Sequence, residues 1–266
     1  MSIAAFSDLD TACKALSLPD LEGALAQDLP VFVADLNQVC NCEVAPLRYV
    51  PVFVSTVKLL IEKPQVSYKD TPLYRYYKSF APKNMAELYG LAANECKMLA
   101  GLSTQDMFEP WVHCKLTGLK IEGIFGPKPD DFIKREFIRF RDVLRSIQRH
   151  GYDPVKFKDR RDGLIMVQAY RAGDRYQLRV IAGNHRAIVL KALGRRYVPV
   201  TFMQNRFLKP INLKSNGIYN PKQSYPKLID LADCRQWPAV KSGCISKTEA
   251  KKMFLTYINN DSTSLD

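Results

Sequence analysis

Residues 176–200 read YQLRVIAGNHRAIVLKALGRRYVPV and contain the pattern that decides the fold. Their first six residues are rich in β-branched and aromatic side chains, which favour a strand, and Gly183 interrupts that run. Asn184 is a suitable N-cap for a helix, because apolar residues recur at helical spacing from there to Gly194. The stretch therefore predicts a strand, a glycine turn, a helix and a second strand.

The start of this helix is a candidate anion site. The first backbone N–H groups of a helix have no acceptor within the helix, and the helix dipole makes that end partly positive. Arg186 and His185 add side-chain donors at the same place. We therefore predict that a phosphate binds at Gly183, Asn184, His185, Arg186 and Ala187.

This segment resembles the glycine turn of the ParB/sulfiredoxin superfamily, which opens a helix that holds nucleotide phosphates. The matching residues are Gly183-Asn184-His185-Arg186, Leu193-Gly194, Val198-Pro199-Val200 and a preceding helix that ends at 146–152. The resemblance covers roughly residues 121–205. It implies an α+β fold, with a small mixed sheet and flanking helices.

The resemblance has two departures and points to one branch of the superfamily. Sulfiredoxins carry a catalytic cysteine in the turn, where this chain has Asn184, so a reductase is not expected. Partition ParB proteins continue into a helix-turn-helix domain, whereas a short proline-interrupted segment follows here. The branch that uses the site for nucleotide chemistry, which includes free serine kinases, remains. Residues 237–250 and Gly126-Pro127 also resemble ParB-like proteins associated with bacterial surface-polysaccharide assembly.

We divide the chain into three regions. Residues 1–120 form an N-terminal α/β region with a candidate acceptor site, residues 121–205 the nucleotide-binding domain, and residues 206–266 an irregular tail with a terminal helix. In the first region we expect two short helices within 1–30, strands at 30–36 and 49–57, an aromatic cluster at 66–83 and one helix at 85–102. The aromatic cluster fits stacking on bases or sugars as well as packing of a helix, and we favour packing.

The other two regions have clearer helix and turn signals. Asp130 or Asp131 is expected to cap a helix that runs to about Arg149, with Phe137, Phe140, Leu144 and Ile147 on its inner face. A hairpin is expected from 164–170 and 176–181 around 172–174, and a strand at 198–203. Ser246 and Glu249 form a capping box that opens a helix to about Tyr257.

Composition and charge bound the class of protein. The seven cysteines are odd in number and scattered, which favours reduced thiols, and no recognised zinc spacing is completed. No apolar run reaches the ~18 residues of a membrane span, and no signal-peptide pattern begins the chain, so we expect a cytoplasmic protein.

Residues 134–209 hold 19 Lys and Arg but 6 Asp and Glu. This excess favours a polyanionic partner, although a solvated face is the alternative for most single arginines.

Phosphoryl transfer needs a carboxylate and usually Mg²⁺ besides a phosphate site. Glu136 is our candidate carboxylate, and its alternative is an ion pair with Arg139 three residues away. His185 is the second candidate catalytic residue, and a helix-capping or carbonyl-bonding role is its alternative. Arg139 and Arg179 are candidate supporting cations. We predict ATP or CTP with Mg²⁺ as the cofactor and no protein-bound metal.

Two classes of function follow from these residues. The first is a nucleotide-dependent phosphotransferase, kinase-like, that acts on a small hydroxyl compound or a sugar, in bacterial surface-glycan biosynthesis. The alternative is a nucleic-acid-binding or nuclease-like module, or a nucleotide-gated scaffold without turnover. The sequence leaves open the acceptor, the nucleobase and the oligomeric state.

Overall fold

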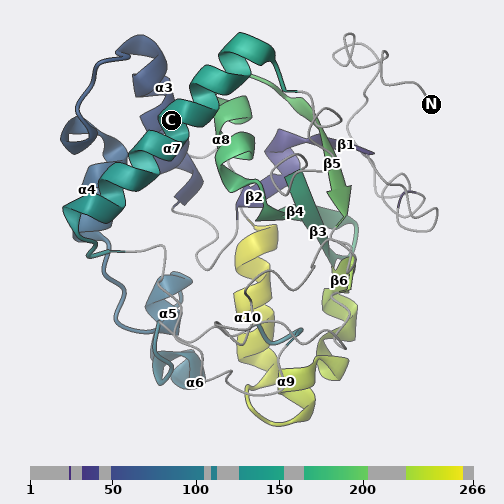
Figure 1. The fold of residues 1–266 in the computed structure, drawn as a ribbon. Coiled ribbons are helices and arrows are strands. Elements are labelled where there is room, and N and C mark those ends of the chain that lie inside the picture. Colours follow the sequence, from purple (N-terminus) through teal and green to yellow (C-terminus); the bar gives the residue numbers. More distant parts are fainter. Residues whose placement is uncertain are drawn as a thin grey trace, which may run out of the picture.

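The computed structural model describes residue 24 and residues 32–41, 49–104, 109–112, 126–152, 165–202 and 226–259. In these parts the chain folds as an α+β protein in which helices flank a small mixed sheet, as predicted (Figure 1). The two helices expected within residues 1–30 lie outside the described residues, apart from Ala24.

The sheet is built around one hairpin. β3 and β4 pair antiparallel on either side of the predicted turn, β5 runs parallel to the first half of β3, and β6 runs parallel to its second half. The strand order is β1-β5-β3-β4-β2. The strands are β1 (Phe32–Asp35), β2 (Val39–Asn41), β3 (Ile165–Ala172), β4 (Arg175–Ala182), β5 (Tyr197–Phe202) and β6 (Leu228–Asp230). The predicted N-terminal and C-terminal regions therefore contribute strands to the same sheet as residues 165–202.

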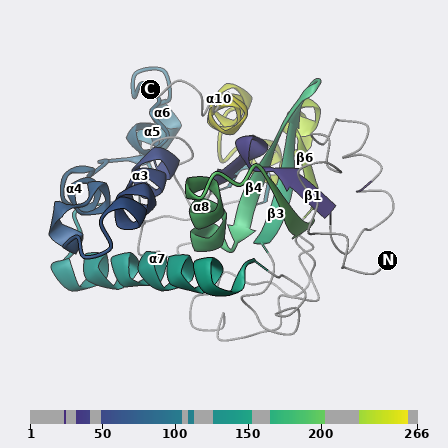
Figure 2. The same cartoon turned by 90° about the horizontal axis from the view of Figure 1, so that it is seen from above.

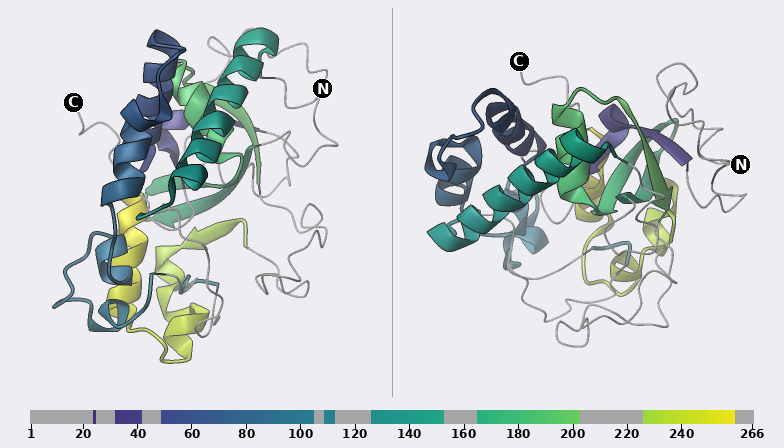
Figure 3. Two further views of the ribbon diagram at one scale, coloured as in Figure 1. Left: turned by 60° about the vertical axis from the view of Figure 1, so that its left-hand side comes forward. Right: turned by 45° about the horizontal axis from the view of Figure 1, so that its top comes forward.

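Helices cover both faces of the sheet. They are α3 (Tyr49–Glu62), α4 (Pro72–Ser79), α5 (Met85–Leu88), α6 (Lys97–Ala100), α7 (Asp130–His150), α8 (Asn184–Ala192), α9 (Pro238–Lys241) and α10 (Lys247–Ile258), with 3₁₀ turns η2 (Leu36–Gln38), η3 (Tyr68–Asp70) and η6 (Leu231–Gln236). α8 packs against α3 and α7, and α10 packs against β3 and β4. Figure 2 shows α3, α4 and α8 on one side of α7, and Figure 3 shows α7 beside α8 from two further directions.

Alternation along β3 sends its side chains to two separate cores. Val167 and Ala169 lie in one apolar cluster together with Ala187 and Leu190 of α8. Tyr170 points the other way and joins a second cluster that includes Phe254 and Tyr257 of α10. Successive residues of a strand face opposite sides, so the hairpin is buried on both faces.

Several predicted elements are confirmed. The expected strand at 30–36 is β1, the hairpin is β3 and β4, and the strand expected at 198–203 is β5. The predicted capping box is present, because the Ser246 hydroxyl accepts the Glu249 N–H and lies 2.9 Å from the Glu249 carboxylate. Tyr76 and Tyr77 of the aromatic cluster are buried and pack on Phe53, which agrees with the packing interpretation.

The strand predicted at residues 49–57 is wrong, because this segment is the first part of α3. Its β-branched residues suggested a strand, but Phe53, Val57 and Leu60 are buried at helical spacing. Pro51 lies in the first turn, where a missing N–H costs the helix no hydrogen bond. Packing on α8 and α4 therefore overrides the local strand preference.

The single helix predicted at 85–102 is also wrong, since it is two short helices, α5 and α6, with turns between them. A contact distant in the sequence explains the break. The Glu249 carboxylate of α10 accepts the N–H groups of Met98 and Leu99 at 2.8 and 3.4 Å. The Glu249 carboxylate thus gives an acceptor to the first N–H groups of α6. In one continuous helix these groups would donate to carbonyls of the preceding turn instead.

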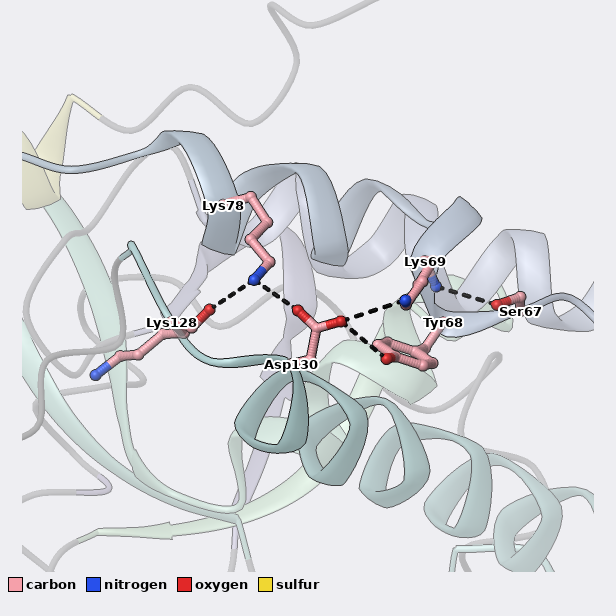
Figure 4. Close-up of polar contacts among 6 residues, drawn as sticks. All are labelled: Ser67, Tyr68, Lys69, Lys78, Lys128 and Asp130. Carbon is pink, nitrogen blue, oxygen red and sulfur yellow. Dashed lines mark hydrogen bonds and ion pairs between the residues drawn. The ribbon is translucent and has the colours of Figure 1, made fainter.

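Asp130 does not cap α7, because Pro129 occupies the N-cap position without a side-chain bond. Asp130 is the first helical residue, and it joins α7 to the preceding segment (Figure 4). Its carboxylate lies 2.6 Å from Lys78 Nζ and 3.5 Å from Lys69 Nζ, and it accepts a hydrogen bond from the Tyr68 hydroxyl. The hydrogen bond from Lys78 lowers the pKa of the Asp130 carboxyl and burial raises it. The net result is a pKa below the usual range. These contacts fix where α7 begins relative to α4.

A close backbone approach just before α7 predicts a sensitive glycine. A Cβ on Gly126 would lie 2.3 Å from the Tyr77 carbonyl oxygen, so Gly126→Ala should lower the free energy of unfolding by about 1–3 kcal/mol. Gly101→Ala is the matched control, because its nearest atom would be 3.4 Å away. Chemical denaturation measures both variants. Equal stability of the two variants would contradict the prediction.

Candidate functional site

The predicted phosphate turn joins β4 to α8. Gly183 rather than Asn184 is the N-cap, with φ 92° and ψ 21°, and Asn184 is the first helical residue. The expectation of an Asn184 cap is therefore wrong, because the left-handed conformation required here favours glycine. The Gly183 carbonyl accepts the Ala187 N–H at 3.0 Å. The N–H groups of Asn184, His185 and Arg186 precede the first bond within the helix, so they have no acceptor inside α8.

Arg186 folds back over this turn. A Cβ placed on Gly183 would lie 3.1 Å from Arg186 Nη2 and 3.1 Å from the Ile165 Cα. The guanidinium therefore lies beside the glycine from which the helix starts. A positive side chain and the positive end of the helix dipole meet at this point, which is the electrostatic arrangement that an anion requires.

The structure brings the two predicted catalytic residues into contact. Glu136 Oε2 lies 3.0 Å from His185 Nε2, and Glu136 Oε1 accepts a hydrogen bond from Arg139 Nη1 at 2.6 Å. The Glu136 side chain is 14% exposed and that of His185 is 29% exposed. Both predicted fates of Glu136 are therefore observed together: it pairs with Arg139, and it also faces the start of α8.

The ring of His185 is held on a second side. Its centroid lies 4.5 Å from that of Phe140, one turn along α7 from Glu136, and Phe140 contacts Phe53 of α3. One carboxylate and one aromatic ring thus restrict the imidazole. With Nε2 facing Glu136, Nδ1 is the ring nitrogen left to meet a ligand.

Burial and charge act in opposite directions on Glu136. Burial disfavours the carboxylate and raises its pKa, whereas the His185 hydrogen bond and the charges of His185 and Arg139 lower it. The balance leaves the pKa of Glu136 below its ordinary value. The carboxylate is therefore ionised at neutral pH and serves as a hydrogen-bond acceptor.

The sequence reasoning missed one residue near the site, Tyr152, and the surroundings of the Asn184 side chain, a residue already assigned to phosphate binding. The Tyr152 hydroxyl accepts the Ile165 N–H at 3.3 Å and donates to the Pro199 carbonyl at 3.4 Å, so it ties the end of α7 to β3 and β5. Burial raises the pKa of Tyr152 to about 12, although the charge of Arg186 opposes that shift. The sequence did offer one indication of Tyr152, because this residue directly follows Gly151, the glycine that ends α7.

The second missed feature is the side chain of Asn184. Its Oδ1 is buried, and within the described residues it has no hydrogen-bond partner. A buried amide oxygen without a donor is costly in a finished fold. A hydrogen-bond donor or a hydrated cation would satisfy it.

Arg179 is not brought to the turn. Its guanidinium pairs with Glu109 and donates to the Tyr170 hydroxyl, and it lies over the rings of Tyr170 and Tyr257. The residue is 4% exposed. Strand alternation places it on the sheet face that α10 covers, whereas α8 packs on Leu178 and Val180 of the opposite face. Its predicted role as a supporting cation is therefore not realised here.

No protein-family model, curated protein or solved structure matches this chain. Of the helices that the structure describes, none combines the length and the apolar character needed to cross a membrane. The described residues also contain no group of three or more His, Cys, Asp or Glu residues arranged to hold a metal ion. The described Cys96, Cys234 and Cys244 are free thiols.

The lowered pKa of Glu136 predicts a pH-dependent contribution to stability. A carboxylate with a depressed folded-state pKa stabilises the fold above its unfolded value near 4.5, and this stabilisation is lost as the pH falls through the lower folded value. Glu136→Gln should therefore be less stable than the wild type at pH 6–7, and the difference should shrink towards pH 3. Urea denaturation across pH measures it, with Glu62→Gln as an exposed control. A difference that is independent of pH would contradict the assignment.

The buried pair of Arg179 and Glu109 predicts a large single-variant cost. Arg179→Met leaves a buried carboxylate without its cation, so it should lower the free energy of unfolding by about 3–5 kcal/mol. The double variant Arg179→Met with Glu109→Met should recover part of this loss, because no buried charge then lacks a partner. Chemical denaturation of the three proteins tests this. A single variant that costs less than the double variant would show that the pair is not coupled.

Proposed function

We propose that this protein is a nucleotide-dependent phosphotransferase of the ParB/sulfiredoxin-like type. The observation that carries the proposal is the 3.0 Å contact between Glu136 and His185 at the first turn of α8. Residues 49 positions apart meet where helix N–H groups and Arg186 converge. A carboxylate, an imidazole and an anion site in one place are the groups that phosphoryl transfer uses.

The turn binds the phosphates in this proposal. The N–H groups of Asn184, His185 and Arg186 donate to phosphate oxygens, and the absence of a Cβ at Gly183 leaves room for the Arg186 guanidinium beside the turn. The Arg186 guanidinium neutralises part of the charge. ATP or CTP is the nucleotide class, and Mg²⁺ bound to it would reduce the remaining repulsion. Asn184 Oδ1 is the oxygen of this chain that would meet the cation or its water shell.

His185 acts as the general base, and Glu136 positions it. The acceptor hydroxyl attacks the terminal phosphorus, a new P–O bond forms, and the bond to the nucleoside diphosphate breaks. The hydroxyl proton passes to His185 Nδ1, while Nε2 remains hydrogen-bonded to Glu136. Glu136 stabilises the imidazolium that results, as a carboxylate does in other carboxylate-histidine pairs. Both oxygens of Glu136 already have partners, so the carboxylate does not itself take the proton.

The acceptor is a small hydroxyl compound or a sugar. The resemblance of this chain to ParB-like proteins of surface-polysaccharide assembly favours an acceptor in bacterial glycan biosynthesis. The order of strand, glycine turn, helix and strand observed from β4 to β5 supports the superfamily assignment. Arg139, whose side chain is 65% exposed beside Glu136, is the cation available at the rim for a phosphorylated or acidic acceptor.

Calorimetric titration with ATP and CTP, each with Mg²⁺, tests the binding step. Arg186→Ala should weaken binding about 10- to 100-fold, because it removes a charged donor to phosphate. Arg195→Ala is the matched control, since Arg195 is an exposed arginine beyond the end of α8. Absence of binding by both nucleotides, or equal effects of the two variants, would contradict the proposal.

Release of nucleoside diphosphate tests the chemical step. His185→Gln should reduce turnover with hydroxyl acceptors at least 100-fold and leave nucleotide affinity within a few-fold, since its role is proton transfer. Glu136→Gln should reduce the rate less and shift its pH profile, because it acts through His185. Nucleotide binding without diphosphate release from the wild type, across an acceptor panel of sugars and amino acids, would contradict phosphotransfer.

A further inference from the structure

The outer face of α7 carries a stripe of cations that the proposed site does not use. Lys134, Arg141, Arg145 and Arg149 follow one another at intervals of seven, four and four residues, so they lie along one side of the helix. We call these four residues the cationic stripe. Ile133, Phe137, Phe140 and Leu144 are buried on the inner side, roughly 100° around the helix axis from the stripe. Figure 2 shows that α3, α4 and α8 all lie on one side of α7.

The positive charges of the stripe are not neutralised by the described parts of the fold. Lys134, Arg145 and Arg149 are exposed and have no hydrogen bond or ion pair with any described residue. Arg141 lies 3.7 Å from Asp142, and its Nε is buried without an acceptor among the described residues. The acidic residues Asp130 and Glu136 of the same helix, by contrast, both have close cationic partners.

Stability of the helix does not explain the stripe. Like charges four residues apart repel each other, and a cation in the second turn, as at Lys134, faces the positive end of the dipole. Only Arg149, in the last turn, is favourably placed for the dipole. Asp142 offsets one charge of the stripe. The remaining cations therefore suit an external polyanion.

We propose that the cationic stripe binds the phosphate backbone of double-stranded nucleic acid. From Lys134 to Arg149 the stripe extends about 22 Å along the helix, and the phosphates of one DNA strand recur every ~3.4 Å along the axis. The inner face of α7 is packed on other helices, so the side that carries the stripe is the one available to the phosphates. Contacts to phosphates do not distinguish one base from another, so we expect the stripe to bind nucleic acid of any sequence.

The composition of this face favours nucleic acid over other polyanionic surfaces. A helix that lies on a lipid surface inserts large apolar residues, and protein interfaces have apolar centres. Among the described residues, the exposed large hydrophobic side chain is Met98 of α6, not a residue of α7. The outer face of α7 offers charge without an apolar patch, which matches a phosphate backbone.

The stripe is separate from the phosphotransferase site. At 100° per residue, Glu136 lies nearly opposite Lys134 and Arg145 around the axis of α7. Nucleic acid on the stripe therefore leaves the start of α8 accessible. This proposal and the proposed function can fail independently of each other.

Fluorescence anisotropy with a 20-base-pair DNA duplex tests the proposal. The full chain should bind duplexes of unrelated sequence equally, and affinity should fall roughly 100-fold between 50 and 200 mM salt for about four phosphate contacts. The triple variant Lys134→Gln, Arg145→Gln and Arg149→Gln should reduce the slope of log affinity against log salt by about 3. A control with the same loss of charge carries Lys58→Gln, Lys63→Gln and Lys97→Gln at exposed positions of other elements, and it should keep the slope nearly unchanged.

Three results would overturn the proposal. These are no duplex binding by the wild type at 25 mM salt, equal effects of the two triple variants, and stripe-dependent binding to phosphatidylserine vesicles without binding to DNA. The thermal unfolding midpoint of each variant shows that it is folded. Because the substituted side chains are exposed, single variants at Arg145 and Arg149 repeat the test if the triple variant is unstable.

Discussion

The contact between Glu136 and His185 determines the geometry of the candidate site. It joins the second turn of α7 to the first turn of α8, two helices that are separated by the whole β3-β4 hairpin. Phe140 adds an apolar contact to the same imidazole. The ring thus lies between the Glu136 carboxylate and Phe140, at the end of α8 whose first N–H groups have no acceptor inside the helix. The arrangement is polar, partly buried and charged, and a stable core alone does not require it.

The rest of the fold keeps these two helices in place. β4 leads directly into Gly183, and the hairpin is fixed on both faces, by α8 on one and by α10 on the other. The buried pair of Arg179 and Glu109 lies beneath α10 between aromatic rings. Tyr152 holds the end of α7 against β3 and β5, and the Asp130 contacts hold its beginning against α4. The site is thus supported at both ends of α7.

The sequence predicted the local elements of the site better than its long-range contacts. The residues from β4 to β5 carry strong local signals, namely a β-rich run, a glycine, a helical period and a second glycine, and all these elements are observed. The approach of Glu136 to His185 was a hypothesis based on residue type, since nothing local specifies a contact 49 residues apart.

Three of the differences between the sequence predictions and the structure share one cause. α3 contains many β-branched residues and so resembles a strand, and α5 is separated from α6 by the distant Glu249. Arg179 follows the alternation of its strand to the face that α10 covers, which no single segment discloses. In each case, tertiary packing decided an outcome that propensity left open.

The central claim is that nucleotide phosphates bind at the first turn of α8. The most direct measurement is the change in backbone amide chemical shifts when ATP and Mg²⁺ are added to ¹⁵N-labelled protein. The amides of Asn184, His185 and Arg186 should shift most, and inorganic triphosphate should reproduce these shifts. Unchanged amides at these three residues, with the largest shifts in other elements, would contradict it.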